Sequence, residues 1–519
     1  MRTVVADIGR RLFRAGTAAC TAAVAAFLVV QLAAWPPHED ETLALFVGRD
    51  SLRGVLGTVL GDRGGAPLHF LFAWVVVHAG GGLGSLRLLS AAFAVASVPV
   101  IALLGARLGG RLAGLIGAAL VSASWVLLFH GVYGRMYSLF LLTSALSYLA
   151  LLAALERGSR RAWTLWGLAV LATVATHPYG AIVLASQGLY VALLRAPLRR
   201  ALLPFAVVAI LGIPFWRTDL VLAGRFDVGV GGGGEKLGGP ASVLRYLLQV
   251  AGDFSAGYTL VLALVLGLAG LGLWVVARAR PRTALLVGAV FATPTVAFLV
   301  ARLNSSTSPE SRHLIFALPF FALVVATGLV RLGPRVALAG VLLLVPAEVA
   351  WGWHKTPQLY SGEPRTRVEA RKEASSWLAR TGRPDDVFLG YDPLFLGAWE
   401  RNPHVSRVVI PRADPRLALR TLRSAPKPLG RGVFVFDASD NNNFTPKPTI
   451  PLRLPEPAVK FDAHVFGPFL VIRTREPTRT TGAFLELAKR TQALGRSLLI
   501  GDADVNYDTI VRAIRRNGG

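Results

Sequence analysis

The sequence predicts an α-helical polytopic membrane protein with about 11 transmembrane helices, followed by a C-terminal extracytoplasmic α/β domain. Of its 519 residues, 53% are hydrophobic and only 16% are charged, and the mean hydropathy is +0.52. Apolar runs alternate with short Arg clusters up to about residue 350, whereas the sequence after about residue 355 is polar and Pro-rich. Arg clusters between spans are a topology signal, so the net charge of +25 does not indicate a nucleic-acid partner.

The first span is expected at about 15–35, where the sequence carries no charge. This stretch is long enough to cross a bilayer core of roughly 30 Å. Four arginines precede it between residues 2 and 14, which predicts a cytoplasmic N-terminus. A cleaved signal peptide would have a shorter apolar region, of roughly 7–15 residues. Cys20, the single cysteine, lies inside this run, so neither an intramolecular disulfide nor a thiolate metal site is expected.

One arrangement of spans places every Arg cluster of the first 350 residues in the cytoplasm. The further spans are expected at about 87–106, 112–130, 136–155, 162–176, 180–195, 201–216, 257–277, 283–301, 313–331 and 335–353. The arrangement requires that the apolar stretch 66–80 does not cross, because a crossing there would place all the following clusters outside. This stretch is shorter than the roughly 20 residues that a span needs. We therefore expect a helix that lies in the outer interface of the membrane.

The chain is expected to divide into a transmembrane module, residues 1–354, and a soluble α/β domain, residues 355–519. Within the second part, helical patterns occur at 366–380, 414–424, 481–494 and 504–516, and strand-like runs at 386–390, 406–410, 432–437 and 467–473. Alternation of this kind is typical of a small α/β domain. The glycines at 231–234 resemble a phosphate loop only superficially, because no Gly-Lys-Ser/Thr ending follows them.

An acidic cluster, His38-Glu39-Asp40-Glu41, follows the first span and opens the external loop 36–86. An Asp at the centre of a spanning helix costs roughly 2.5–3.5 kcal/mol, so these carboxylates are expected at the helix end, near water. There a carboxylate can deprotonate a hydroxyl, and the alternative is a solvated charge run.

Arg, His and Tyr side chains gather on the same predicted face, where polar groups at membrane depth are functional candidates by default. These candidates are His69, Arg87, His130, Tyr133, Arg135, Tyr137, His177, Arg312 and His313.

Short motifs along the chain occur in the order that one family shows. Asp40-Glu41 matches an acidic pair, and Pro67-Leu68 matches the end of a His-Pro-Pro-Leu element. The later matches are Arg87-Leu88-Leu89-Ser90-Ala91, Tyr133 to Tyr137 around Arg135, His177, and Arg312-His313-Leu314 with Pro319.

Over roughly residues 10–350 the chain resembles the bacterial GT-C glycosyltransferases, which are related to the protein O-mannosyltransferases (family 39) and the lipid A aminoarabinose transferases. It departs from their pattern at Gly65, Ala66 and His313, where the family has His, Pro and Tyr.

The resemblance implies a polyprenyl-phosphate sugar as donor, whose tail stays in the bilayer while the sugar projects outside. An acceptor hydroxyl would attack the anomeric carbon with inversion, with Asp40 as general base and Glu41 orienting Asp40 or the acceptor. The leaving group is a phosphate, which cationic side chains must neutralise. The resemblance gives this role to Arg135 and Arg312, then to Arg87, Tyr137 and His313, and gives substrate contacts to His69, His177, Tyr133 and His130. No metal or other cofactor is required.

Several alternatives remain open at the level of sequence. A transferase of the same fold could act on a glycan or a lipid, as in arabinosyl transfer, rather than on a protein. A lipid or polysaccharide transporter should carry ionisable groups near the bilayer midplane, and the expected spans are nearly free of them. A non-catalytic protein could bind a partner through the C-terminal domain. Each alternative keeps the chain in the plasma membrane, with the C-terminal domain outside the cytoplasm.

Overall fold

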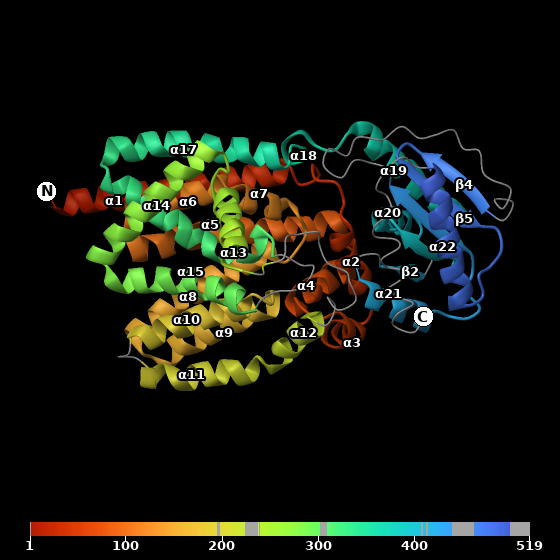
Figure 1. Ribbon diagram of the computed structural model, residues 1–519, viewed down its shortest axis with the longest axis horizontal. Helices are drawn as coiled ribbons and strands as arrows, with labels where there is room; N and C mark the ends of the chain where they lie inside the picture. The colour runs from red at the N-terminus through yellow and green to blue at the C-terminus, as the bar shows by residue number, and fades with distance from the viewer. Residues whose placement is uncertain are drawn as a thin grey trace.

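The computed structural model describes residues 2–194, 198–223, 237, 239–301, 309–405, 408–411, 414–437 and 461–498. A bundle of long helices forms one half of the molecule, and a domain built on a β-sheet forms the other half (Figure 1). The N-terminus lies at the end of the bundle that is far from the sheet. The glycines at 231–234 and the helical pattern expected at 504–516 lie outside the described residues.

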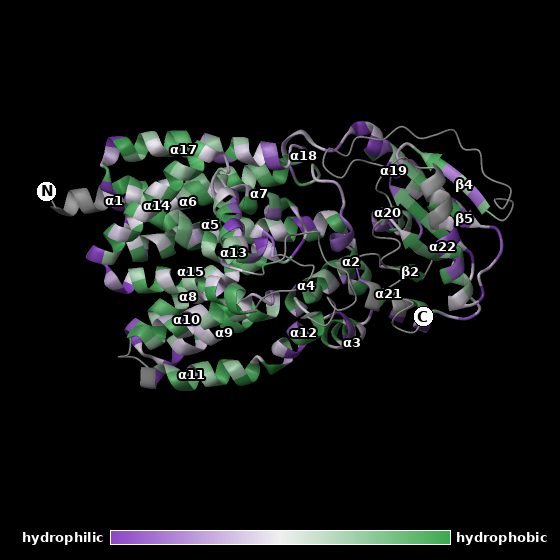
Figure 2. Cartoon of the chain, in the orientation of Figure 1, coloured by the Kyte–Doolittle hydropathy of each residue, from purple (hydrophilic) through white to green (hydrophobic). Residues whose placement is uncertain are grey.

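Each stretch that the sequence predicts to span the membrane contains a helix. The bundle comprises α1 (Arg2–Val30), α5 (Leu83–Gly109), α6 (Arg111–Ala123), α7 (Trp125–Val132), α8 (Tyr137–Arg157), α9 (Arg160–Thr176), α10 (Gly180–Leu194), α11 (Leu198–Leu211), α12 (Ile213–Ala223), α13 (Pro240–Phe254), α14 (Thr259–Ala279), α15 (Pro281–Ala301), the 3₁₀ helix η3 (Ser311–Ala317), α16 (Leu318–Arg331) and α17 (Pro334–Lys355). These helices carry mainly apolar residues, and hydrophilic residues lie toward the bundle ends (Figure 2).

Seven of the described helices are long and apolar enough to cross a membrane, and nine spans result if each of two bent helix pairs counts as one. The stretches expected at 162–176 and 180–195 form α9 and α10, which are shorter, with 17 and 15 residues. The prediction of a polytopic helical membrane protein is therefore confirmed.

The bend between α6 and α7 brings functional candidates to one end of the bundle. The two helices meet at an angle of 54°, at Ser124, whose backbone is extended. The indole of Trp125 then donates to the hydroxyl of Thr356, 2.8 Å away, just after the end of α17. Consequently α7 and the residues that follow it lie at the end of the bundle that faces the β-sheet domain (Figure 1).

The apolar stretch 66–80 forms α4 (Pro67–His78), a helix of 12 residues that packs beside α2 (Glu39–Gly48). The chain enters α4 through Gly64, Gly65 and Ala66, which all have positive φ, of 77°, 67° and 50°. Proline has φ fixed near −65° and cannot occupy position 66 in this backbone. The alanine at position 66, where the family has proline, is thus compatible with this left-handed backbone.

The β-sheet domain is a five-stranded sheet in the order β2-β1-β3-β5-β4. Its strands are β1 (Val387–Gly390), β2 (Val408–Ile410), β3 (Gly432–Asp437), β4 (Phe461–Phe466) and β5 (Phe469–Thr474). β1 pairs in parallel with β2 and β3, whereas β5 runs antiparallel to β3 and to β4. The sequence predicts β1, β2, β3 and β5 at nearly these positions but not β4.

Helices cover both faces of this sheet. α21 (Pro415–Ser424) and α22 (Thr481–Leu498) bury one face, with Leu422 and Phe484 fully buried. α19 (Arg365–Thr381) and α20 (Asp392–Arg401) bury the other, with Leu378 and Phe395 in its core. Alternate side chains of each strand point to opposite faces, so both cores draw on the same strands and form a three-layer α/β/α domain.

The α/β domain packs against the loop that connects α1 to α5, which contains α2, α3 (Leu52–Gly57), the π-helical turn η1 (Thr58–Arg63) and α4. Phe46 of α2 meets the ring of Trp399 edge-on, with centroids 4.8 Å apart, and the Arg49 guanidinium lies 3.8 Å from the same ring. Arg420 of α21 pairs with Asp62 of η1. The domain therefore rests on the elements that carry the acidic cluster.

We predict that the α/β domain lies outside the cytoplasm, because it occupies the bundle end opposite the N-terminus, which four arginines assign to the cytoplasm. Protease added to intact spheroplasts should remove the domain, as detected with a C-terminal epitope tag. A matched tag at the N-terminus should survive until the membrane is lysed. Protection of the C-terminal tag in intact spheroplasts would refute this topology.

Candidate active site

The acidic cluster forms the first turn of α2, whose start is fixed by a reciprocal cap. The Nδ1 atom of His38 accepts from the backbone N–H of Asp40 at 3.1 Å, and the Glu41 carboxylate accepts from the backbone N–H of His38 at 3.0 Å. Such a capping box satisfies N–H groups that a helix start leaves unpaired. It also sends Asp40 and Glu41 in different directions from one rigid turn, so the two carboxylates have different surroundings.

Glu41 is fully buried, and its carboxylate accepts four hydrogen bonds. Oε1 accepts from Nε of Arg87 (2.8 Å) and from the backbone N–H of Gly134 (2.7 Å). Oε2 accepts from Nη2 of Arg87 (2.7 Å) and from the backbone of His38 (3.0 Å). A carboxylate offers about four acceptor positions, so no position is left for a substrate. The expected role of Glu41 in orienting an acceptor is not supported by this geometry.

The N–H groups of Arg87 are likewise all bonded within the protein. Besides its two bonds to Glu41, it donates from Nη1 to the carbonyls of Leu32 (3.3 Å) and Trp35 (2.7 Å), and from Nη2 to that of Pro36 (3.2 Å). These five bonds use all five N–H donors of a guanidinium. In this structure Arg87 joins α5 to the end of the first span and to α2, so the expected contact with a lipid phosphate would have to replace one of these bonds.

Asp40, by contrast, is partly open to solvent, with its side chain 23% exposed. Its Oδ1 lies 2.7 Å from Nη1 of Arg135. The Tyr133 hydroxyl lies 3.4 Å from its Oδ2 and closer, at 2.9 Å, to Nδ1 of His38. Burial alone would lower the pKa of the Arg135 guanidinium, but the adjacent Asp40 carboxylate raises that pKa above its ordinary value. Arg135 therefore stays charged beside a carboxylate that remains partly exposed.

The ring of Tyr137 is the centre around which the other candidates gather. The Arg135 guanidinium carbon lies 5.9 Å from its centroid, and that of Arg312 lies 5.1 Å from it. Three histidine rings surround the same phenol, at centroid distances of 4.7, 5.6 and 6.0 Å: His130, His177 and His313. Residues from three separate parts of the sequence thus form one cluster, as the sequence predicts.

Several buried nitrogens of this cluster point at no acceptor. Among the described residues, Nε of Arg135, Nε of Arg312, Nδ1 of His130 and Nε2 of His69 have no hydrogen-bond partner. Buried polar atoms are paired in the great majority of cases. Three of these four atoms, on Arg135, Arg312 and His130, belong to residues in contact with the Tyr137 ring, so a ligand with acceptor oxygens is expected beside this ring.

The positive charge of this cluster comes from its two arginines. Burial, and then the charges of Arg135 and Arg63, lower the pKa of His69 to about 3. Burial, and then the charges of Arg135 and Arg312, lower the pKa of His177 to about 3. Both histidines are therefore neutral near pH 7. Among these residues, Arg135 and Arg312 therefore carry the positive charge.

Sequence reasoning missed Asp253, which binds the residue before Arg312. Asp253, at the end of α13, accepts from the Ser311 hydroxyl at 2.5 Å and lies 3.1 Å from Nζ of Lys355. Glu310 pairs with Arg312 itself at 2.5 Å. The acid–hydroxyl contact joins residues 58 positions apart, and no local pattern reveals it. The Gly134 N–H was also missed, although Gly134 lies inside the Tyr133–Tyr137 motif.

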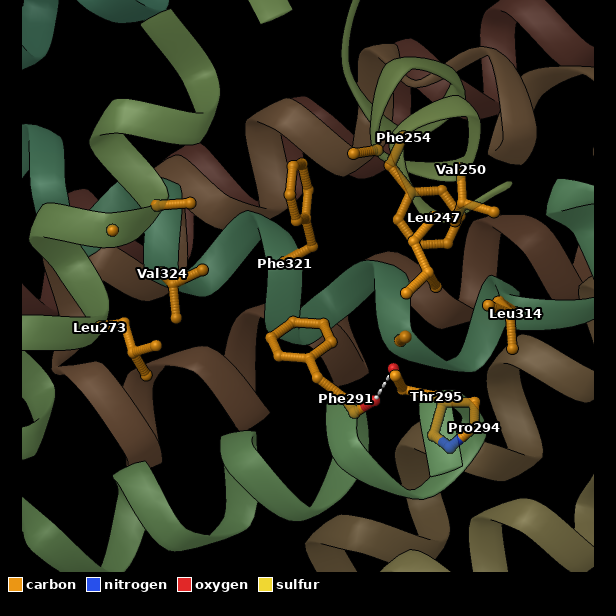
Figure 3. A pocket seen from close by; sticks show the side chains of 14 residues that line it. Leu247, Val250, Phe254, Leu273, Phe291, Pro294, Thr295, Leu314, Phe321 and Val324 are labelled. Atoms are coloured by element: carbon orange, nitrogen blue, oxygen red, sulfur yellow. Dashed lines mark hydrogen bonds between the residues drawn. The ribbon is translucent and has the colours of Figure 1, made fainter. Parts of the chain in front are cut away.

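An apolar cavity of about 300 Å³ lies beside η3, between α13, α14, α15 and α16 (Figure 3). Phe321 and Leu314 line it, and the hydroxyl of Thr295 is bonded to the Phe291 carbonyl at 2.8 Å. Leu314 follows Arg312 by two residues on the same 3₁₀ helix. The η3 helix thus carries the cationic side chain of Arg312 and also lines the apolar cavity.

Comparisons with known proteins identify the fold. No family model and no curated protein matches the sequence. Among solved structures, ArnT from Cupriavidus metallidurans in the apo state is similar with a TM-score of 0.56, at 14% identity over 88% of this chain and 97% of that chain. The same protein bound to undecaprenyl phosphate gives 0.54 at the same identity and coverage.

The Archaeoglobus fulgidus oligosaccharyltransferase, tethered with an acceptor peptide that contains the NVT sequon, gives a TM-score of 0.50. Its identity is 12%, over 81% of this chain and 69% of that chain. Both proteins are members of the GT-C fold. The chain therefore has the GT-C fold that its motifs predict.

The Glu41–Arg87 pair should be a large stabilising element. Arg87→Met keeps the stem but leaves a buried carboxylate without its cation, which typically costs about 3–5 kcal/mol. We expect a clearly lower thermal-unfolding midpoint for the purified protein in lipid nanodiscs. Arg107→Met is the matched control, because its partner Glu156 is largely exposed and a surface pair is worth about 0–1 kcal/mol. Equal midpoints for the two variants would contradict the assignment.

Arg135 and Arg312 should bind the anionic group of a ligand. Arg135→Ala and Arg312→Ala should each weaken binding of undecaprenyl phosphate at least tenfold, because a charge-assisted hydrogen bond is worth about 1.5–3 kcal/mol. Lysine at either position should restore binding only in part, because the planar fork is lost. Arg53→Ala, which changes an exposed arginine of α3, is the control. Unchanged affinity in both Ala variants, measured by microscale thermophoresis, would remove these residues from the site.

Proposed function

We propose that this chain is a membrane glycosyltransferase that moves a sugar from a polyprenyl-phosphate donor to an acceptor hydroxyl on the outer face of the membrane, with inversion. The observation that carries the proposal is the placement of Asp40: a partly exposed carboxylate lies 2.7 Å from an arginine that shares one tyrosine ring with a second arginine. A base and an anion site are thus adjacent, as a displacement at a sugar phosphate needs.

The protein offers a cationic surface for the phosphate of the donor and an apolar surface for its lipid tail. Its phosphate would lie between Arg135 and Arg312, where buried nitrogens lack partners among the described residues. Its isoprenoid tail would enter the apolar cavity that begins at Leu314, since apolar burial favours such a tail without requiring directional contacts. The binding of undecaprenyl phosphate by ArnT, which has the same fold, supports this class of donor.

In the proposed reaction, Asp40 accepts the proton of the acceptor hydroxyl as its oxygen forms a bond to the anomeric carbon. The bond from that carbon to the phosphate oxygen breaks, and the electron pair leaves with the polyprenyl phosphate. Arg135 and Arg312 stabilise the charge that develops on this leaving group. A single displacement inverts the anomeric configuration. The reaction needs neither metal nor other cofactor, and the sugar could pass to a glycan, a lipid or a protein.

The proposal gives the two acids of the pair unequal roles. Asp40 would be the catalytic base, because acceptor and donor can both approach its exposed edge. Glu41 would act only through the Arg87 pair that holds α2 in place. His69, His130, His177 and His313 would contribute hydrogen bonds to the bound donor, and Tyr133 would orient the base. A transporter would need no carboxylate in this position, and a turnover assay separates the two functions.

Asp40→Asn should abolish sugar transfer while leaving the protein folded. Asn keeps the size of the side chain and can still accept from Tyr133, but it cannot take a proton. General-base catalysis is worth roughly 10²–10⁴-fold, so turnover should fall by that factor while donor affinity changes little. The measurement is transfer of radiolabelled sugar from polyprenyl phosphate in membranes with matched expression.

Asp50→Asn is the matched control, since it makes the same chemical change at an exposed acid at the end of α2. It should retain full turnover. Near-normal sugar transfer by Asp40→Asn would contradict the proposed mechanism.

A further inference from the structure

The two prolines between the first span and α2 can form backbone hydrogen bonds only through their carbonyl groups. Pro36 and Pro37 have no backbone N–H, and they directly precede His38, the cap of α2. Arg87 binds the carbonyls of Trp35 and Pro36 from inside the transmembrane bundle. The next carbonyl, that of Pro37, is bound from the other side of the molecule.

That bond comes from the α/β domain. The hydroxyl of Tyr391 donates to the carbonyl oxygen of Pro37 at 3.1 Å, across 354 positions of sequence. Pro37 lies three residues before Asp40. The turn of helix that carries the proposed base is therefore fixed on one side by the bundle and on the other side by the C-terminal domain.

Tyr391 is itself held rigidly at the carboxyl end of β1. It follows Gly390, whose φ is 135° and where a Cβ atom would lie 2.2 Å from the carbonyl oxygen of Val435 in β3. Only glycine permits this turn. The phenol then stacks on Phe469, with centroids 5.3 Å apart and planes at 22°. The hydroxyl thus reaches Pro37 from a fixed backbone and a fixed ring.

A buried network of charged side chains also holds the Tyr391 hydroxyl in place. Arg367 of α19 is 1% exposed; it donates to the Tyr391 hydroxyl at 3.3 Å and to Asp437, at the end of β3, at 2.5 Å. It also pairs with Glu363. Tyr391 and Asp437 follow adjacent parallel strands at the point where the strand order reverses, which is where α/β sheets usually place functional groups. Here that edge faces the loop with Asp40.

We propose that the C-terminal α/β domain is a positioning part of the transferase, acting through Tyr391, which Arg367 orients, to hold Pro37 and so Asp40. Tyr391 is a positioning residue because it touches the loop and not the reacting atoms. The expected effect on turnover rests on the proposed function, whereas the expected effect of Tyr391 on the mobility of the loop does not. Loss of the hydroxyl should loosen the start of α2 and lower kcat, with donor affinity unchanged.

The test uses Tyr391→Phe in the full-length protein in lipid nanodiscs. Hydrogen exchange of backbone amides in residues 38–48 should become faster, because the carbonyl of Pro37 loses its donor. The value of kcat should fall about 3- to 10-fold, the size expected for one hydrogen bond, with the same Kd for undecaprenyl phosphate. Pro37→Gly, which loosens the loop without touching the α/β domain, should have the same two effects.

Tyr258→Phe is the matched control, because this hydroxyl also donates to a backbone carbonyl, that of Ala350, at 3.1 Å. It should change neither exchange in residues 38–48 nor kcat. If Tyr391→Phe leaves both at the wild-type level, or if Tyr258→Phe lowers kcat equally, the positioning role is refuted. If the wild type transfers no sugar, the proposed function fails, and the exchange measurement alone decides whether Tyr391 holds the loop.

Discussion

The buried ion pair between Glu41 and Arg87 is the interaction on which the rest of the site depends. Two charges taken out of water are costly unless geometry and hydrogen bonding are nearly complete, and here both side chains use every donor or acceptor position. The pair joins the second span of the sequence to the end of the first and to the start of α2. Because α2 cannot shift without breaking it, the neighbouring Asp40 occupies a fixed position at the bundle end.

Much of the fold can be predicted from the sequence because its signals are strong and local. Long apolar runs and Arg clusters indicate the spans, and the stretch 66–80 forms a helix of only 12 residues, shorter than an ordinary span. The bends at Ser124 and near Gly212 were not predicted, since they depend on how neighbouring helices pack. In the α/β domain β4 was missed, although its central residues, Asp462 to Val465, alternate between polar and apolar side chains as in a strand with one solvated face.

The membership of the candidate site was easier to predict than the role of each member. Arg135, Tyr137, His177, Arg312 and His313 do lie together, as the common outer face suggested. The sequence motifs place Glu41 and Arg87 among the site residues, whereas the three-dimensional structure shows that they bind each other. The support from Asp253 and from Tyr391 joins residues far apart in the chain, which no local pattern indicates.

The proposed site is made by two domains, in which rigid supports would leave one carboxylate and two arginines available to substrate. A structure of the protein with bound undecaprenyl phosphate tests this account most directly. We expect phosphate oxygens within roughly 2.7–3.2 Å of both Arg135 and Arg312, the tail in the cavity beside Phe321, and Asp40 next to the phosphate. A lipid phosphate bound elsewhere, with Arg135 and Arg312 making no contact to it, would contradict the account.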